Sequence, residues 1–483
     1  MDVLDFIDTY IWYVAFVLII CVGVYATVRL RGIQVAGFKE MVKVTFLNRG
    51  DRREGKLSSF QVFCMSMGSR IGVGNITGPI LAILVGGPGA ILWMWVFALI
   101  GMATSFLETT VAQIYKVPKE NGGYRGGPAY TLFHGLGMKR LGMIAAFVMI
   151  LMYLVGFIFG EVISMSEAVH NAFDFDGINL VFAILLTAAT ALLLVGGVYK
   201  IADLSVKVVP LMAIAWFAVC IVSIAFGPEG ILNGIYSIFE YAFNIPSVIG
   251  GGVGAIIITG MQRGVWSNEA GIGTITNLSG MADVKHPVSQ GYTQAIGVLI
   301  DTLVSTMTAL VVLSYADINA LVGSGLESIP LLQSIFTDTL GSVAPYVVMI
   351  FMFIFAFTCL MSDIVIGEGN LMLIKESKVA KWGMWVLLLA VVFLSSFYAS
   401  DALVVIMDIL LAVCAFFNTF IMIKLARRGI EAFRDYRRQK AEGVEEPVFH
   451  KSCLSDDSGV TEWADVPRKP LPNHFIRFSA RIL

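Results

Sequence analysis

Hydrophobic residues follow one another in long runs along this chain, separated by shorter polar segments. A helix that crosses a bilayer needs about 20 mostly apolar residues. Eleven segments fit this requirement, and each predicts one membrane-spanning helix: 10–29, 58–84, 89–115, 141–168, 178–196, 206–227, 248–276, 288–314, 343–370, 382–398 and 402–424. The pattern therefore predicts an all-α polytopic membrane protein with eleven transmembrane helices.

The first apolar segment is expected to remain in the protein as a helix. Asp2, Asp5 and Asp8 precede it, where a cleavable signal peptide would carry basic residues. Lys and Arg gather in loop 30–58 and then in every second connection, up to the tail that follows Lys424. The other connections contain neither Lys nor Arg: 1–9, 84–89, 169–177, 228–247, 315–342 and 399–401. Because basic loops stay in the cytoplasm, we expect a multi-pass protein of the cell membrane with its N-terminus outside and its C-terminus in the cytoplasm.

Composition narrows the possible functions to those of a membrane protein. The chain is 57% hydrophobic and only 14% charged, whereas a soluble protein carries about 25% charged residues. A net charge of -2 gives no basic surface for a nucleic acid. The six cysteines form no C-x-x-C pair and the five histidines stand singly, so neither a metal centre nor a redox centre is expected. These observations exclude a soluble enzyme, a disordered regulator and a nucleic-acid-binding protein.

Two of the predicted helices contain too many glycines to be continuous. Residues 68–79 hold four glycines and one proline, and residues 260–273 hold four glycines. Each glycine inside a helix costs about 1 kcal/mol relative to alanine. Irregular backbone at membrane depth is tolerated only where it lines a cavity or is buried in protein. We expect both helices to be unwound there and to face a central site, although close helix packing is the alternative use of such glycines.

The two breaks lie in helices 2 and 7, five helices apart. Because five is odd, the second group enters the membrane from the opposite face, which describes an inverted repeat of helices 2–6 and 7–11. The expected units are helix 1 with a basic loop, two five-helix repeats and a cytoplasmic tail: 1–57, 58–247, 248–426 and 427–483. The tail is expected to be a short amphipathic helix followed by a flexible end.

A broken helix offers both kinds of partner that an amino acid zwitterion requires. The N-terminus of a half-helix presents free N–H groups to a carboxylate, and the C-terminus of a half-helix presents free carbonyls to an ammonium group or a small cation. The chain has no Walker A motif, so no nucleotide drive is expected. The pattern favours a secondary transporter. The alternatives are a channel, which is normally built from several chains, and a membrane enzyme, which would need a convergent nucleophile and base.

Several motifs in this order resemble the alanine or glycine:cation symporters of the amino acid–polyamine–organocation superfamily. They include Gly-Val-Gly-Asn-Ile-Thr-Gly, Gly-Gly-Pro-Gly-Ala and Arg-Gly-Val-Trp-Ser-Asn-Glu-Ala-Gly, at 72–78, 86–90 and 263–271. The resemblance covers residues from about 10 to 425. It implies the leucine-transporter-like five-plus-five inverted repeat. It also implies import of a small neutral amino acid, alanine or glycine, coupled to sodium, with no organic cofactor.

The resemblance also implies which residues meet the substrate and the ion. The substrate would lie against the two breaks and one residue of helix 9: Gly72, Val73, Gly74, Asn75, Gly264, Val265, Trp266 and Asp363. Sodium would be held by backbone carbonyls of helix 2 and by groups of helix 9: Gly68, Ile71, Phe355, Thr358 and Cys359.

Three positions depart from the family's pattern. Val73 stands where threonine is common, Cys359 where a hydroxyl residue is usual, and Asp363 where the family has a tryptophan. A thiol is a poor ligand for a hard cation such as sodium. Aspartate leaves a larger and more negative pocket than tryptophan does. Proton coupling and a larger or more polar substrate are therefore the alternatives within the same fold.

Seven acidic residues lie inside the predicted helices: Glu108, Glu161, Glu240, Glu269, Asp301, Asp363 and Glu368. A charge at the middle of the membrane costs a few kcal/mol, so each is expected to face protein or water. Structural pairing is favoured for most of them, for example Arg263 with Glu269, or Arg70 with Glu108 or Asp301. For Asp363 a role in the pocket is as strongly favoured as a structural one.

Overall fold

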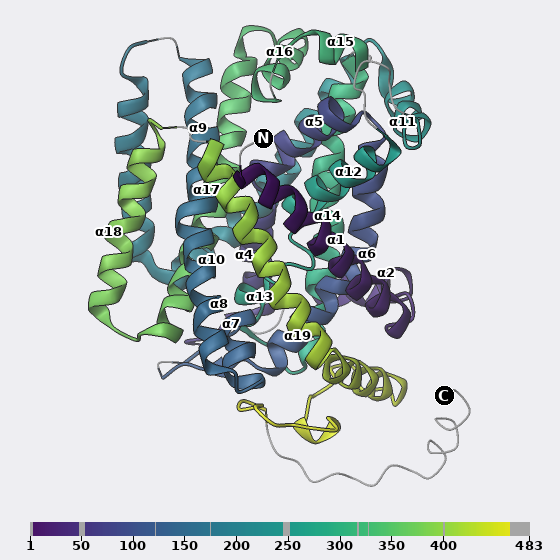
Figure 1. The fold of residues 1–483 in the computed structure, drawn as a ribbon, viewed down its shortest axis with the longest axis vertical. Coiled ribbons are helices and arrows are strands. Elements are labelled where there is room, and N and C mark those ends of the chain that lie inside the picture. Colours follow the sequence, from purple (N-terminus) through teal and green to yellow (C-terminus); the bar gives the residue numbers. More distant parts are fainter. Residues whose placement is uncertain are drawn as a thin grey trace.

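The structure is a computed structural model that describes residues 3–47, 54–120, 122–173, 175–244, 252–315, 318–326, 328–398 and 401–463. The expected border between the repeats at 247/248, three arginines of the first basic loop (Arg49, Arg52 and Arg53) and residues 464–483 of the tail lie outside these ranges. The described chain is mostly helical, which confirms the predicted all-α class (Figure 1).

Helices of the first expected repeat are α4 (Ser59–Arg70), α5 (Gly74–Gly86), α6 (Ala90–Ile114), α8 (Lys139–Leu151), η3 (Met152–Phe157), α9 (Ile158–Ala172) and α10 (Ile178–Phe226). A capping box starts α4: the Ser58 hydroxyl accepts from the Gln61 N–H at 3.2 Å, and Gln61 Oε1 accepts from the Ser58 N–H at 3.0 Å. Helices α8 and α9 are joined through η3, which has π-helical hydrogen bonding, so the fourth predicted helix is continuous but locally widened.

Helices of the second expected repeat are α12 (Val253–Asn268), α13 (Thr276–Ser279), α14 (Pro287–Tyr315), α17 (Ala344–Ile374), α18 (Lys378–Ser395) and α19 (Asp401–Ala441). The remaining helical segments are α1 (Val3–Arg29), α2 (Ile33–Ala36), α3 (Phe38–Val42), η1 (Lys43–Leu47), α7 (Pro128–Tyr130), η2 (Thr131–Gly135), α11 (Gly230–Glu240), α15 (Ile318–Gly323), α16 (Ser328–Leu340), η4 (Gly341–Val343) and η5 (Lys451–Cys453).

Four two-residue strands lie between the helices: β1 (Leu57–Ser58), β2 (Val117–Pro118), β3 (Tyr124–Arg125) and β4 (Ala282–Asp283). β2 and β3 form an antiparallel pair, and β1 pairs in parallel with β4. Because β1 precedes α4 and β4 follows α13, this short pairing joins the ends of the two broken helices.

Nine helical stretches within the described ranges are long and apolar enough to cross a membrane. The expected count of eleven is therefore not confirmed, and two local features account for the difference. The fifth and sixth predicted helices are merged in α10, which is kinked at Gly197, where φ is 70° and ψ is 175°. The first half of the seventh, α12, has 16 residues, too few for a span by itself.

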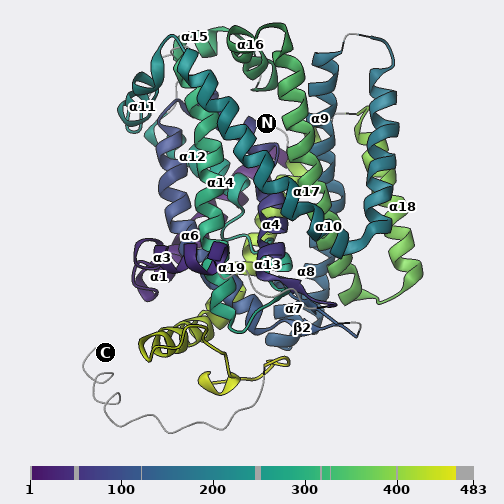
Figure 2. The same ribbon diagram turned by 180° about the vertical axis from the view of Figure 1, so that it is seen from behind.

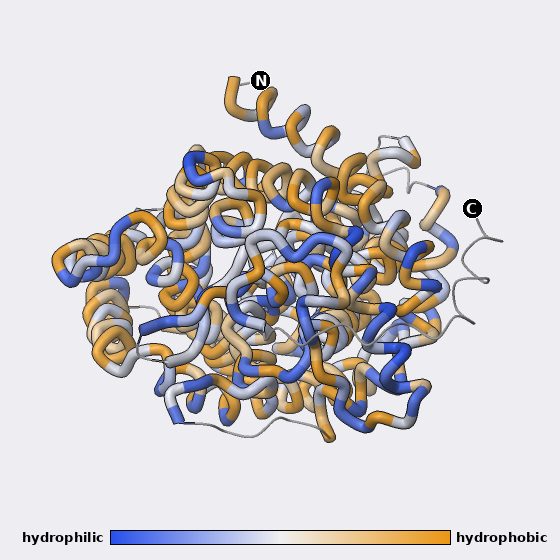
Figure 3. The backbone as a smooth tube through the Cα atoms, turned by 90° about the horizontal axis from the view of Figure 1, so that it is seen from below, coloured by the Kyte–Doolittle hydropathy of each residue, from blue (hydrophilic) through white to orange (hydrophobic). Residues whose placement is uncertain are grey.

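The core of the bundle is formed by α6, α14, α5 and α12 on one side and by α17, α4, α8 and α9 on the other. Viewed along its long axis, the bundle is apolar at its periphery, where α1 also lies (Figure 3). Several large aliphatic side chains are exposed on α10 and α18: Leu192, Val195, Leu211, Ile214 and Val386. An exposed apolar surface of this kind suits contact with lipid.

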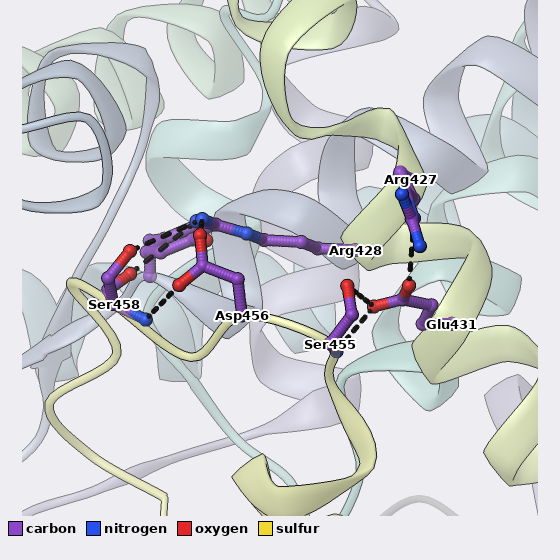
Figure 4. Close-up of polar contacts among 7 residues, drawn as sticks. Arg427, Arg428, Glu431, Ser455, Asp456 and Ser458 are labelled. Atoms are coloured by element: carbon purple, nitrogen blue, oxygen red, sulfur yellow. Dashed lines mark hydrogen bonds and ion pairs between the residues drawn. The ribbon is translucent and has the colours of Figure 1, made fainter.

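Beyond the bundle, α19 continues without interruption to Ala441, and the chain then folds back beneath the bundle as far as residue 463 (Figure 1). We call 442–463 the tail segment, and the end of the bundle that it covers the tail face. Two residues of α19 bind the tail segment. Glu431 accepts from the backbone N–H and the hydroxyl of Ser455, and Arg428 contacts Asp456 and Ser458 (Figure 4).

Apolar side chains also fasten the tail segment. Phe449 and Leu454 are each 2% exposed. The Trp463 indole N–H donates to the Gln113 carbonyl at 3.2 Å, and its ring packs on Phe449 with the ring centroids 5.1 Å apart. The tail segment is therefore a packed part of the tail face.

Candidate substrate and ion site

The first break separates α4, which ends at Arg70, from α5, which begins at Gly74. Ile71 leaves the helical conformation, with φ of -79° and ψ of 80°. A Cβ atom at Gly72 would lie 2.5 Å from Cys359 Sγ and 2.9 Å from Glu161 Oε1. Only glycine fits here, because α17 and α9 approach the backbone of the break so closely.

The second break separates α12, which ends at Asn268, from α13, which begins at Thr276. Glu269, Gly271 and Gly273 have φ angles of 54°, 91° and 85°. A non-glycine residue at positive φ is uncommon and often marks a functional position. The two breaks predicted from the sequence are therefore both present.

The breaks face each other near the middle of the bundle, where α4, α13, α14 and α17 come together (Figure 2). Gly74, at the start of α5, is half buried. The nearest atom to a Cβ built there is the Trp266 carbonyl oxygen of α12, at 4.0 Å. Gly74 therefore has more free space around it than Gly72, and its backbone lies opposite the end of the other broken helix.

Most N–H groups around the first break have partners within the protein. The Gly72 N–H donates to the Arg70 carbonyl and to Asn75 Oδ1, each at 3.0 Å, and the Asn75 N–H donates to the Gly72 carbonyl at 3.1 Å. The Val73 N–H lies near the Glu161 carboxyl group. Among the expected donors for a substrate carboxylate, Val73 and Gly74 carry the N–H groups to which none of these hydrogen bonds assigns a partner, and Gly74 has the more open surroundings.

Asn75 holds together a buried cluster of oxygen groups. Its amide nitrogen lies 2.6 Å from Asp301 Oδ1 and 3.0 Å from the hydroxyls of both Ser267 and Ser305. The Ser267 hydroxyl also donates to Asp301 Oδ2 at 2.7 Å. These groups come from α5, α12 and α14. The carboxylate and hydroxyl oxygens of this cluster are ligand types that a hard cation prefers, whereas the Asn75 amide oxygen is engaged by the Gly72 N–H.

The expected sodium ligands of α4 and α17 lie side by side. A Cβ atom at Gly68 would be 3.4 Å from both Thr358 Cβ and the Thr358 carbonyl oxygen. The Thr358 hydroxyl lies 2.9 Å from the Phe355 carbonyl oxygen, to which it donates. The Cys359 thiol donates to the Ser69 carbonyl at 3.1 Å. Ile71 is the residue that terminates α4 at this point.

The three expected pocket residues of α12 lie in different surroundings. Gly264 packs against α6, with Met94 Cα 3.6 Å from the position of its Cβ. Val265 is fully buried, and its carbonyl accepts from the Glu269 N–H. Trp266 is half buried, and its ring meets the edge of Phe157 of η3 at a centroid distance of 6.1 Å. Trp266 is thus the member of this group that reaches toward the fourth helix.

Acidic groups gather on the other side of the first break. Asp363 of α17 and Glu161 of α9 are 2% and 8% exposed. Glu161 and Glu269 are the charged groups that act on Asp363. The Tyr153 hydroxyl of η3 donates to Glu269 Oε2 at 3.3 Å. The π-helical segment thus supplies a donor to the break, which agrees with the frequent occurrence of such segments at functional sites.

Arg70 is buried beside these acidic groups, but its hydrogen bonds go to neutral acceptors. Its guanidinium donates to the carbonyls of Asn268 and Gln294, to Gln294 Oε1 and to the Ser105 hydroxyl, at 2.9 to 3.1 Å. The Glu108 carboxylate accepts from the Asn418 amide at 2.7 Å. Arg70 and Glu108 are therefore hydrogen-bonded to neutral partners rather than to each other, and the acidic groups that act on Arg263 are Asp408 and Asp8 rather than Glu269.

A cavity of about 630 Å³ opens toward the tail face below the breaks. Its wall includes residues from β2–β3, α13 and α17: Lys119, Arg125, Tyr130, Asn277, Val365 and Glu368. Burial and, to a smaller extent, the neighbouring Arg125 lower the pKa of Lys119 to about 8. Asn277 belongs to α13, which follows the second break, and Val365 belongs to α17, which packs against α4, so the cavity lies beside the elements that surround the breaks.

Two parts of this site were not identified from the sequence as site residues. Ser267, Asp301 and Ser305 join Asn75 only through the folded chain, since Asn75 and Asp301 are 226 positions apart. The presence of Asp301 in a predicted membrane helix was a signal, but it did not reveal its partner. Tyr153 carried no signal at all, because the π-helical turn that aims it is a product of packing.

Comparisons with known proteins identify the family of the chain. The profile of the "Sodium:alanine symporter family" matches residues 1–451. The chain is 36% identical to the "Probable sodium/glutamine symporter GlnT" of Bacillus subtilis (strain 168), over 92% of each chain. It is 34% identical to the "Putative sodium/proton-dependent alanine carrier protein YrbD" of the same organism, over 90% of this chain and 91% of that protein.

A solved structure supports the fold. The "Crystal structure of MhsT in complex with L-phenylalanine" superposes with a TM-score of 0.53 at 16% identity, over 85% of this chain and 94% of that one. The predicted transporter fold is thereby confirmed, and the family consists of transporters rather than enzymes. The chain belongs to the sodium:alanine symporter family and is a multi-pass membrane protein that carries an amino acid together with a cation.

Proposed function

We propose that this protein imports a small neutral amino acid of the alanine or glycine class by alternating access, coupled to sodium that moves down its gradient. The N-terminus would lie outside the cell, and the tail face would be cytoplasmic. The observation that carries the proposal is the pair of facing breaks, with the backbone of Gly74 opposite the carbonyl of Trp266. This pair brings an N–H donor and a carbonyl acceptor together inside the membrane.

The substrate would use the two ends of the broken helices separately. Its carboxylate would accept from the Gly74 N–H at the positive end of α5. Its ammonium group would donate to carbonyls at the end of α12, of which the Trp266 carbonyl lies nearest to Gly74. Val73, Asn75 and Gly72 would shape the break, since their hydrogen bonds hold its backbone in place.

Two groups of oxygen atoms support sodium as the coupling ion. One is formed by Thr358 and the carbonyls around Gly68, Ile71 and Phe355, where α17 meets the end of α4. The other is the cluster around the Asp301 carboxylate, which is fully buried and surrounded by an amide and two hydroxyls. A buried carboxylate with neutral partners gains the most from a bound cation.

The cavity at the tail face suits the release of the substrate into the cytoplasm. It lies between α13 and α17, and Arg125 and Lys119 stand in its wall. Basic side chains attract the carboxylate of an amino acid as it leaves the breaks. Movement of α13 or of the tail-side half of α17 would widen this path.

A second candidate is proton coupling with the same fold. It is favoured by one observation: Cys359 places a thiol, a poor ligand for sodium, beside Glu161, a buried carboxyl group that can carry a proton. A relative at 34% identity also bears the name of a sodium/proton-dependent carrier.

Uptake by the purified protein in liposomes tests the proposal. Labelled alanine is offered under an inward sodium gradient, under an inward proton gradient and under neither. Sodium-driven accumulation supports the first candidate, and accumulation driven only by protons supports the second. Gly74→Leu should abolish uptake without preventing insertion, because its side chain would fill the space in front of Trp266. Normal uptake by a well-folded Gly74→Leu protein would contradict the site.

A further inference from the structure

Two carboxyl oxygens beside the first break have no hydrogen-bond partner within the described part of the chain. They are Asp363 Oδ2 of α17 and Glu161 Oε2 of α9. Both side chains are at least nine-tenths buried, with exposed fractions of 2% and 8%. Burying a polar group without a partner is costly. These two oxygens therefore point to a donor that the chain itself does not supply.

The side chains around Asp363 do not provide that donor. The charged groups that act on it are Glu161 from α9 and Glu269 from the second break, and both are acidic. The Tyr153 hydroxyl of η3 already donates to Glu269. The Cys359 thiol, one turn before Asp363 on α17, donates to the Ser69 carbonyl.

Arg70 is the buried basic group of this region, and all three nitrogens of its guanidinium donate to other partners. Its bonds run to Asn268, Gln294 and Ser105, which belong to the second break, α14 and α6. Arg70 therefore cannot turn toward Asp363 without losing several hydrogen bonds, each worth about 1 kcal/mol.

Glu161 connects Asp363 to the expected position of the substrate. Its carboxyl group lies near the Val73 N–H, and its Oε1 atom lies 2.9 Å from the position of a Cβ on Gly72. The adjacent Gly74 N–H is the proposed donor to the substrate carboxylate. An amino acid held there has the Glu161 and Asp363 carboxyl groups beside it, on the side formed by α9 and α17.

We propose that Asp363 and Glu161 receive the side-chain end of the transported amino acid, and that this side chain ends in a nitrogen donor, either a carboxamide or an ammonium group. The inference rests on the proposed transport at this site and extends its substrate class from alanine and glycine to amino acids with a nitrogen-bearing side chain. An alanine methyl group would leave both oxygens without a partner, whereas an N–H donor would satisfy them. A carboxylate side chain would be repelled by three acidic neighbours.

Wild-type protein provides the first test. Sodium-driven uptake of labelled alanine into liposomes is measured with unlabelled glutamine, lysine, leucine and glutamate as competitors. Glutamine or lysine should compete at least about tenfold better than leucine, which corresponds to one hydrogen bond to a charged group. Glutamate should compete least. Leucine that competes as well as both nitrogen-bearing side chains overturns the inference, while the proposed function stands as long as alanine accumulates.

Two substitutions distinguish the nitrogen groups. Asp363→Asn keeps the shape and one acceptor but removes the charge. It should weaken competition by an amino acid with an ammonium side chain about tenfold or more, and competition by one with a carboxamide side chain by much less. Asp363→Leu removes both acceptors and should weaken either one.

The control is Asp338→Asn, which neutralises an exposed carboxylate on α16 and should leave the competition profile unchanged. Thermal stabilisation of the purified variants by each amino acid gives a second measurement that does not depend on transport. An identical order of competitors in wild type, Asp363→Asn and Asp363→Leu would show that Asp363 does not touch the side chain. Absence of any sodium-driven uptake by wild type would instead count against the proposed function.

Discussion

Gly72 is the position in the first break where an added methyl group meets the most severe crowding. In Gly72→Ala, the Cβ atom would stand 2.5 Å from Cys359 Sγ and 2.9 Å from Glu161 Oε1. Ordinary contact begins near 3.5 Å, so the sulfur would have to move by roughly 1 Å. Neither neighbour can move away freely, because both side chains are buried and the Cys359 thiol is hydrogen-bonded to the Ser69 carbonyl.

The magnitude follows from two contributions. Overpacking in a buried site costs about 1–3 kcal/mol. Displacing the Glu161 carboxyl group from its place near the Val73 N–H adds to this cost. We expect a lower melting temperature in detergent and a loss of uptake of about tenfold or more, since 1.4 kcal/mol corresponds to a factor of ten.

The assay compares Gly72→Ala with Gly160→Ala in the same liposome uptake experiment and the same thermal denaturation experiment. Gly160 lies next to Glu161 on α9, and the nearest atom to its Cβ would be Met407 Cε at an ordinary 3.9 Å. Its replacement should therefore leave uptake unchanged. Wild-type melting temperature and uptake in Gly72→Ala would refute the close approach of α9 and α17 to the break.

Three further predictions concern the ion and the tail face. Thr358→Ala should raise the sodium concentration for half-maximal uptake and Cys359→Ser should lower it, since a hydroxyl is the better sodium ligand; unchanged values in both would place the ion elsewhere. Burial lowers the pKa of Lys116 from 10.5 to about 7. The charged ammonium group therefore destabilises the folded state, and this destabilisation is complete below pH 7 and decreases as the pH rises toward 10.5. Lys116→Met should therefore raise the melting temperature more at pH 7 than at pH 9, and an equal gain at both values would contradict this. Trp463→Ala should lower the free energy of unfolding by about 2 kcal/mol, half of what a fully buried tryptophan loses, and should expose the tail segment to protease, with unchanged digestion counting against its packing.

The breaks in the helices could be predicted because glycine and proline act locally. Within 68–79 four glycines and one proline weaken the helix, and irregular backbone of this kind is tolerated at membrane depth only in the protein interior or along a cavity. The second break follows from the same reasoning. The structure places both where the glycines indicated, with Gly271 and Gly273 in left-handed conformations that other residues rarely adopt.

The course of the fourth and fifth helices could not be predicted in the same way. The π-helical segment η3 carries a single glycine, Gly156, and its hydrogen bonding depends on how α17 and α19 pack against it. In α10, Gly197 alone bends the chain, so helices expected as separate spans follow each other without a loop. Apolar runs locate spans, but they do not define where one helix ends and the next begins.

The hydrogen-bond partners of the buried polar residues could not be predicted from the sequence either. Intramembrane arginines and carboxylates suggested ion pairs, because opposite charges attract most strongly where water is absent. In the structure, carbonyls and amides surround Arg70, and Asn75 and two serines surround Asp301. A neutral network satisfies the geometry of a guanidinium or carboxylate as well as a salt bridge does, and which partner is near depends on the tertiary fold.

This choice of partners offers a physical reason for coupled transport. Five buried carboxyl groups surround the breaks (Glu108, Glu161, Glu269, Asp301 and Asp363), and Arg70 is the one buried guanidinium that the described residues place beside them. If these groups were paired within the chain, a cation would gain little by entering. Because their partners are neutral, these carboxyl groups can still interact with an entering cation. Each positive charge that enters also lowers the free-energy cost of ionising a neighbouring carboxyl group. Sodium near Asp301 and a nitrogen donor near Asp363 would then stabilise the same closed arrangement from two sides. Two ligands that favour one conformation necessarily favour each other's binding.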